Sequence, residues 1–149
     1  VLTGNVMWGR AKEEERRAVM AAFAAAPRYH TLGLANAYIN DGLAVLLADV
    51  LRSNPSLTLL NIESNSVSTG GVEALAAALR DNTTLKELKL ANQRGYFAMA
   101  AEDALADALE QNHTLTRLTV ELRSTNARDR KDKYMMRNKN EERLANNAA

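Results

Sequence analysis

Apolar residues recur along the chain with a period of about 28 residues, and this repeat is the dominant feature of the sequence. One shift superimposes Leu32 on Leu60, and a second shift of equal length brings Leu60 onto Leu88. The next step, which carries Leu75 onto Leu105, is longer by two positions. Because many further positions agree under the same shifts, the chain is predicted to consist of stacked copies of one unit.

Each unit combines a short strand with a helix. In the stretch 57–65, the alternation of Leu60 and Ile62 predicts a strand with one buried face, and Asn65 predicts a turn after it. Apolar residues then follow at helical spacing until Arg80, which predicts an amphipathic helix. The candidate N-caps of the helices are Asp41 in one unit and Ser68 or Thr69 in the next.

A strand, a turn and a helix in every unit of this length are typical of leucine-rich repeats. One such unit cannot bury its own apolar face, so the units are expected to stack. We predict an α/β fold: a right-handed leucine-rich-repeat solenoid of the ribonuclease-inhibitor type, with a parallel sheet on the concave face, helices on the convex face and a C-terminal capping helix. Residues 1–149 are expected to form a single domain. Its expected parts are repeats at about 1–28, 29–56, 57–84 and 85–114, a terminal strand at 115–122, and a capping loop and helix at 123–145.

The carboxyl end of the solenoid needs closure, because an open repeat exposes apolar side chains and an unpaired strand edge. We predict a polar loop over 124–133, followed by a helix over 134–145. The side chains expected to contact the final repeat are Met135, Met136 and Leu144.

The amino end resembles an incomplete unit. Val1 and Val6 occupy strand positions of the repeat, and Trp8 is a candidate cover for the open edge. The apolar stripe 18–26 is in register with Leu47, which predicts that it belongs to the solenoid core. Because the chain begins with a valine at a repeat boundary, we expect it to be a fragment of a longer protein.

Composition narrows the class of protein. Hydrophobic residues make up 46% and charged residues 25% of the 149 positions, a balance typical of a soluble globular chain. No apolar run approaches the roughly 18 residues that a membrane span needs. The absence of cysteine excludes disulfides and thiolate metal sites, so a cytoplasmic location is expected.

Charge is unevenly distributed. The net charge is +1, but residues 123–143 hold eight Lys/Arg against four Asp/Glu, a net +4, and the remainder carries −3. This basic tail indicates either a docking face for an acidic partner or a solvated terminal helix.

The sequence offers no constellation for catalysis, so we predict a domain that is not an enzyme and holds no cofactor or metal. His30 and His113 have no partner histidine at metal-ligand spacing. The pair 70–71 is not followed by the Gly-Lys-Ser/Thr of a phosphate loop. Because Gly42 occupies the same slot as Gly70, we interpret both as turn residues before a helix.

Two exposed surfaces remain as candidates for protein binding. The side chains between the buried leucines of each strand are expected to face the concavity, and they vary from repeat to repeat: Leu59, Asn61, Glu63, Glu87, Lys89, Arg117, Thr119 and Glu121. The stretch 92–101 is longer by two positions than its counterparts and carries Arg94, Tyr96 and Phe97. Aromatic residues beside arginine are typical of interface anchors, but Tyr96 and Phe97 could equally fill a gap between repeats. No basic stripe with interleaved aromatics is present, which argues against nucleic acid as a partner.

Several segments carry a resemblance to a known family. The runs Asn61-Ile-Glu-Ser-Asn65 and Leu88-Lys-Leu-Ala-Asn-Gln93, and the phrases Asn82-Thr-Thr-Leu85 and Asn112-His-Thr-Leu115, resemble the leucine-rich-repeat domain of tropomodulins and leiomodins. The tail with Met135-Met136 is similar to the terminal helix of that family. The resemblance covers about 29–143 and implies a domain that supplies one actin-binding surface to proteins that cap or nucleate filament pointed ends. The family's tropomyosin-binding helices have no counterpart in this sequence, so no tropomyosin binding is expected.

Two hypotheses for function follow. In the first, a cytoskeletal, actin-binding domain contacts its partner through the 94–97 loop and a basic face made of Lys131, Lys133, Arg137 and Lys139. In the second, a generic leucine-rich-repeat scaffold binds an unrelated protein through its concave face, because this fold serves many partners.

Overall fold

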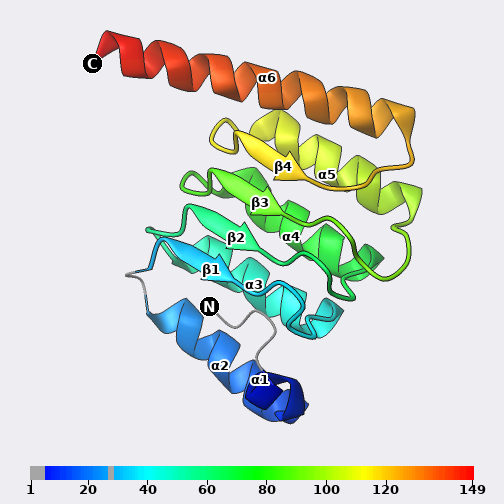
Figure 1. Cartoon of the computed structure of the whole chain (residues 1–149). Helices are drawn as coiled ribbons and strands as arrows, with labels where there is room; N and C mark the ends of the chain where they lie inside the picture. The colour runs from blue at the N-terminus through cyan, green and yellow to red at the C-terminus, as the bar shows by residue number, and fades with distance from the viewer. Residues whose placement is uncertain (1–5, 27–28) are drawn as a thin grey trace.

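Helices and strands alternate along the computed structural model, which describes residues 6–26 and 29–149 (Figure 1). Within these residues there are four strands, each of three residues, and six helices. In chain order the elements are α1 (Val6–Arg10), α2 (Glu13–Ala25), β1 (Thr31–Gly33), α3 (Asp41–Ser53), β2 (Leu59–Asn61), α4 (Thr69–Asp81), β3 (Glu87–Lys89), α5 (Met99–Gln111), β4 (Arg117–Thr119) and α6 (Thr125–Ala148).

The four strands form one parallel sheet in the order β1-β2-β3-β4. The register places Leu32 opposite Leu60, Leu60 opposite Leu88, and Leu88 opposite Leu118. All four leucines are buried. The register therefore confirms the predicted repeat, including the longer last step between successive strands.

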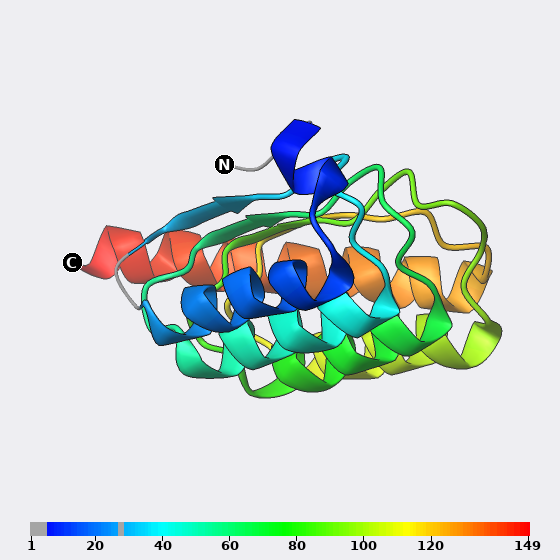
Figure 2. The ribbon, with the colours of Figure 1, turned by 90° about the horizontal axis from the view of Figure 1, so that it is seen from below.

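The strands line one wall of the molecule and helices α2 to α5 line the other (Figure 2). Packed helices need an axial spacing of about 8–10 Å, whereas paired strands lie about 4.8 Å apart, so the strand wall is the inner, concave one. The core lies between the walls, where Leu47, Leu75 and Leu105 are buried. The predicted α/β leucine-rich-repeat solenoid is confirmed.

Small residues allow the helices to approach one another closely. A Cβ atom on Gly71 would lie 2.6 Å from Asp41 Oδ1 and 2.7 Å from Val67 Cγ1. Gly42 and Gly70 lie in the first turns of α3 and α4, so the prediction that they are turn residues before a helix is wrong. A Cβ atom on Gly42 would lie 2.7 Å from the end of the Arg17 side chain, and one on Gly70 would meet only Asp41 Oδ2 at 3.6 Å, an ordinary contact.

Buried asparagines tie each repeat to the preceding one. The Asn82 Oδ1 atom accepts from the backbone N–H of Thr84 at 3.0 Å and of Leu85 at 2.8 Å, and its amide donates to the Leu51 carbonyl at 2.8 Å. Asn112 makes the equivalent bonds one repeat later, including one to the Leu79 carbonyl at 2.7 Å. These residues satisfy backbone groups at the points where the chain turns from helix to strand.

Polar side chains also satisfy the turns that follow the strands. Asn65 Oδ1 accepts from Ala37 N–H at 2.9 Å, and its amide donates to the Leu34 carbonyl at 2.9 Å. Gln93 makes corresponding bonds in the next unit. At the last unit the carboxylate of Glu102, which is buried, accepts from the backbone N–H groups of residues 123 and 124.

One predicted helix cap is wrong. Asn40, not Asp41, is the N-cap of α3, and its side chain accepts from Leu43 N–H at 3.0 Å. The Asp41 carboxylate instead accepts from the backbone N–H of Ser68 at 2.7 Å and from the Ser68 hydroxyl at 2.5 Å. The hydrogen bonds of Asp41 therefore link the start of α4 to the start of α3.

The amino end departs from the predicted repeat. Val1 lies outside the described residues, and Val6 begins the short helix α1 instead of occupying a strand. Trp8 is buried as expected, and its indole N–H donates to the Ala37 carbonyl. In α2 Met20 is buried and Phe23 and Ala24 pack against the core, so the predicted core role of the stripe 18–26 holds for these residues and not for Val19, which is 36% exposed.

The carboxyl end is closed by α6, which lies along the side of α5 (Figure 1). The predicted loop over 124–133 is wrong, because α6 begins at Thr125 and Ser124 caps it by accepting from Ala127 N–H at 3.2 Å. Met135 is buried as predicted. Met136 and Leu144 are 61% and 63% exposed, so their predicted contact with the last repeat is wrong.

Candidate protein-binding surfaces

On the concave surface, three of the predicted charged side chains are paired with one another. Arg117 and Glu87 form an ion pair at 3.3 Å, and Lys89 approaches the same carboxylate at 3.9 Å. The Thr119 hydroxyl donates to Glu63 Oε1 at 3.2 Å. A partner that docks here must replace these contacts, which lowers the net gain from its own charges.

The three residues of the loop between β3 and α5 that were predicted to act together differ in exposure. Tyr96 is 77% exposed, and Arg94 is exposed. Phe97 is 5% exposed and belongs to the core, so its predicted role in partner binding is wrong. Phe97 fills the space that the longer loop opens, and Tyr96 remains available to a partner.

Arg123 is a surface residue that the sequence reasoning did not find. Its guanidinium lies 4.8 Å from the centre of the Tyr96 ring and donates to the Phe97 carbonyl at 2.8 Å. Both contacts join positions far apart in the sequence, so no local pattern identifies them. They hold the exposed Tyr96 ring against a cation, an arrangement typical of interface anchors.

The basic residues of α6 differ in availability. Lys133 and Lys139 are exposed, and within the described part of the chain no carboxylate lies at ion-pair distance from either. Lys131 is partly buried and pairs with Asp132 at 3.0 Å. Asp107 bonds Arg130 and raises the pKa of its guanidinium, which stays charged.

Arg137 is a structural residue rather than a free cation. Its guanidinium donates to the carbonyls of Leu109 at 3.0 Å, Glu110 at 2.9 Å and Asn112 at 2.7 Å. It thereby satisfies the carbonyls at the C-terminus of α5, where a cation also interacts favourably with the helix dipole. The prediction that Arg137 forms part of a partner-binding face is not supported by this geometry.

The two histidines are separate and exposed. His30 Nδ1 lies 2.8 Å from the Ser56 carbonyl, and His113 Nδ1 lies 2.8 Å from Glu141 Oε2. In residues 6–26 and 29–149 no group of three or more His, Cys, Asp or Glu side chains could hold a metal ion. Over the same residues no helix is long and apolar enough to cross a membrane.

Comparisons with known proteins agree on one family. Residues 10–141 match the TMOD/LMOD leucine-rich domain. Leiomodin-2 of Mus musculus is 39% identical over 88 residues, which are 59% of this chain and 16% of the relative. Tropomodulin-4 of Homo sapiens is 41% identical over 98 residues, which are 66% of this chain and 28% of the relative. The chain thus spans well under a third of the curated relatives it matches.

Two solved structures share the fold over nearly the whole chain. A structure titled leiomodin-1 actin-binding site 2 has a TM-score of 0.89 and 26% identity, covering 97% of this chain and 82% of its own. The tropomodulin C-terminal domain of Caenorhabditis elegans has a TM-score of 0.87 and 27% identity, covering 94% of this chain and 84% of its own.

Proposed function

The chain belongs to the tropomodulin and leiomodin family through its leucine-rich domain, and from this premise we propose that it is a non-catalytic, cytoskeletal domain that binds actin at filament pointed ends. The observation that carries the proposal is the structural match to an actin-binding site of leiomodin-1 over 97% of the chain. The alternative, an unrelated scaffold that uses the concave face, is less favoured because Glu87, Lys89 and Arg117 of that face already pair with one another.

The proposed contact surface joins the Tyr96 loop to the basic helix. Arg123 packs on Tyr96 and lies two positions before α6, so the loop and the start of the helix are neighbours. Tyr96 supplies an exposed aromatic anchor, and Arg94 and Arg123 supply cations beside it. Lys131, Lys133 and Lys139 extend positive charge along α6.

The two parts of this surface contribute to different stages of binding. Charges on α6 steer an acidic partner such as actin toward the domain, so association slows as salt rises. Tyr96 contributes contact area after docking, so its loss mainly accelerates dissociation.

The test is pointed-end elongation of pyrene-labelled actin together with filament cosedimentation. We expect Lys133→Glu with Lys139→Glu, and separately Tyr96→Ala, to weaken binding by about tenfold each. A matched control is Arg10→Glu with Arg52→Glu, which makes the same change in charge at the far end and should bind normally. If the unmodified chain changes neither elongation nor sedimentation at high concentration, the proposal is wrong for this chain.

A further inference from the structure

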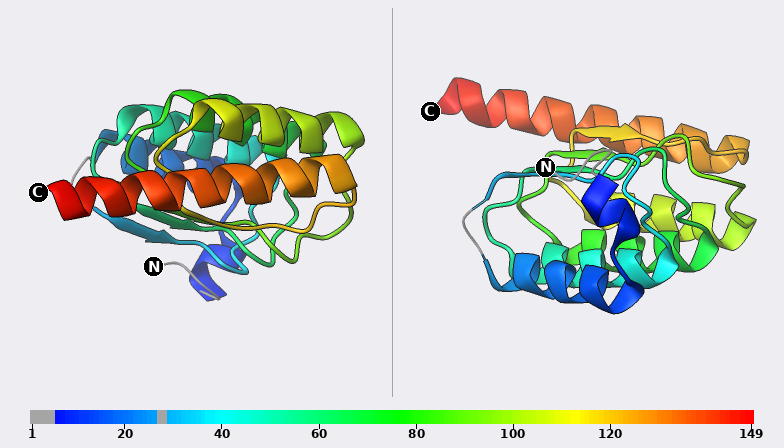
Figure 3. Two further views of the ribbon diagram at one scale, coloured as in Figure 1. Left: turned by 90° about the horizontal axis from the view of Figure 1, so that it is seen from above. Right: turned by 60° about the horizontal axis from the view of Figure 1, so that its bottom comes forward.

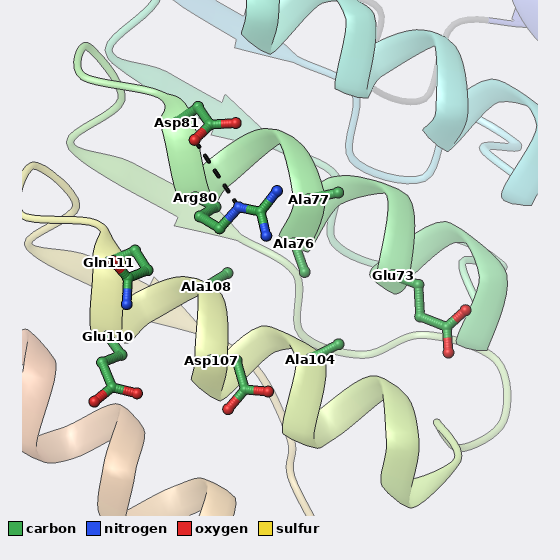
Figure 4. A pocket seen from close by; sticks show the side chains of 10 residues that line it. All are labelled: Glu73, Ala76, Ala77, Arg80, Asp81, Ala104, Asp107, Ala108, Glu110 and Gln111. Carbon is green, nitrogen blue, oxygen red and sulfur yellow. Dashed lines mark ion pairs between the residues drawn. The ribbon is translucent and has the colours of Figure 1, made fainter.

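Helices α5 and α6 begin at the same end of the molecule (Figure 3), and α5 carries a buried carboxylate there. Glu102, in the first turn of α5, is 1% exposed. Asp107 and Glu110, further along α5, are exposed instead; they lie beside the groove between α4 and α5 (Figure 4) and pair with Arg130. Because a buried charge is costly unless it is hydrogen-bonded, the groups that satisfy Glu102 indicate its role.

The Glu102 carboxylate is satisfied by two adjacent backbone groups. Its Oε1 atom accepts from the N–H of Arg123 at 2.9 Å, and its Oε2 atom accepts from the N–H of Ser124 at 2.7 Å. In earlier units the turns after the strands are satisfied by the neutral amides of Asn65 and Gln93. The fold itself therefore does not require a carboxylate at such a turn, and here each N–H bonds a separate charged oxygen, which strengthens both bonds.

The two bonded residues belong to the two parts of the proposed actin-binding surface. The Arg123 guanidinium lies 4.8 Å from the centre of the Tyr96 ring and donates to the Phe97 carbonyl at 2.8 Å. Ser124 is the N-cap of α6, the helix that carries the exposed lysines. A single carboxylate therefore fixes both the residue that supports the Tyr96 ring and the residue at which α6 is capped.

We propose that Glu102 is a positioning residue of this surface, which holds Tyr96 and the lysines of α6 in the relative placement that actin requires. This role rests on the proposed function, because it concerns the same contact surface. With the two hydrogen bonds intact, the surface is ordered before docking, and binding does not have to supply that order. Glu102 is buried, so it acts through Arg123 and Ser124 rather than by contact with actin.

Glu102→Gln tests the role on the chain alone. The variant keeps the size of the side chain, but its NH2 group cannot accept a hydrogen bond, so one of the two backbone N–H groups loses its acceptor. We expect the NMR resonances of the amide protons of residues 123 and 124 to move upfield, and the ring-current shift that Tyr96 imposes on the Arg123 side chain to decrease. An Arg123 side chain that keeps its full ring-current shift in the variant would overturn the proposal.

A double-mutant cycle with Tyr96→Ala tests the role in actin binding. Glu102→Gln should weaken binding by about fivefold, mainly through faster dissociation. The dependence of the association rate on salt should not change, because Lys133 and Lys139 are untouched. Combined with Tyr96→Ala, Glu102→Gln should cause little further loss, since no Tyr96 ring is left to position. Losses that multiply in the double variant would count against the proposal, because independent effects combine in that way.

The matched control is Asp41→Asn. The Asp41 carboxylate likewise accepts two hydrogen bonds, from the backbone N–H and the hydroxyl of Ser68, but it lies at the start of α3, outside the proposed surface. Thermal melts check that both variants remain folded, and only Glu102→Gln should weaken actin binding. If Asp41→Asn weakens binding equally, the proposal is wrong. If the unmodified chain does not bind actin, the proposed function is wrong, and the ring-current measurement still decides whether Glu102 positions Arg123.

Discussion

The two ends of the solenoid are closed by different means. At the carboxyl end, α6 satisfies the last junction with side chains: the Asn138 amide donates to the carbonyls of Asn112 at 2.9 Å and Leu115 at 2.8 Å. At the amino end, the Tyr29 hydroxyl donates to the Phe23 carbonyl at 2.6 Å. Among the described residues, the Asn54 amide of that junction has no hydrogen-bond partner.

The difference shows that an end of the solenoid is closed by side chains that hydrogen-bond free backbone groups, as much as by apolar side chains that cover the core. Phe23 stands one repeat before Leu51, so its carbonyl is the one that the Asn54 amide would take by analogy with Asn82. Burial raises the pKa of Tyr29, an effect that the nearby Asn54 side chain partly offsets. Among the described residues, the amino-terminal junction is therefore the less completely satisfied of the two.

The largest effect on stability is expected at Met135, and it should distinguish this residue from its neighbour Met136. Met135→Ala removes a buried side chain, and we expect a loss of about 3 kcal/mol in the free energy of unfolding. Met136→Ala should change stability by less than about 0.5 kcal/mol, because that side chain is exposed. Urea titrations of both variants provide the comparison, and equal midpoints would show that α6 does not depend on Met135.

Next in size is the loss of the asparagine that closes the last junction. Asn138→Ala removes the donor to the Leu115 carbonyl, whereas the Asn112 carbonyl keeps its bond to Arg137, and the change should cost about 2 kcal/mol. Asn140→Ala, two positions further along α6 and exposed, is the matched control. A change of similar size in both variants would mean that the helix, and not the junction bond, is responsible.

A smaller effect is expected at the amino end. Tyr29→Phe removes one hydroxyl that bonds a half-buried carbonyl, at a cost of about 1 kcal/mol. Tyr38→Phe changes the same atom on a ring that is 55% exposed and should have no measurable effect on the melting temperature. If Tyr29→Phe costs more than Asn138→Ala, the order of the two ends proposed here is reversed.

The smallest effect on stability is expected from the exposed lysines of α6. Lys133→Glu with Lys139→Glu should alter the free energy of unfolding by less than about 0.5 kcal/mol, because exposed charges contribute little to folding. Differential scanning calorimetry at low and high salt checks this. A large destabilisation would mean that these lysines support the cap, and the loss of actin binding in this variant would then need another explanation.

The repeat core was the part of the molecule that the sequence predicted best. Leu60 and its counterparts are buried because stacked units must share one core, and these leucines stay in register across the sheet even where the last step is longer by two residues. Prediction failed where a residue acts outside its own unit. Arg123, Arg137 and Glu102 owe their roles to contacts between segments far apart in the sequence, and no local pattern distinguishes them from surface residues.

The start of α6 was missed for a different reason. Its first turns are rich in polar residues, which are also typical of loops, and only Ala127 and Tyr134 are buried there. A helix that buries such a narrow stripe has a weak apolar periodicity. Its stability comes from packing on α5, which cannot be predicted from the sequence of α6 alone.

The packing of each helix mainly on its sequence neighbours has a kinetic consequence. In such an array, the opening of one repeat removes the support of the next, so local unfolding spreads from an end. The unequal closure of the two ends gives this process a direction. Amide hydrogens in α2 should exchange with solvent first, those of α3 and α4 later, and those beneath α6 last.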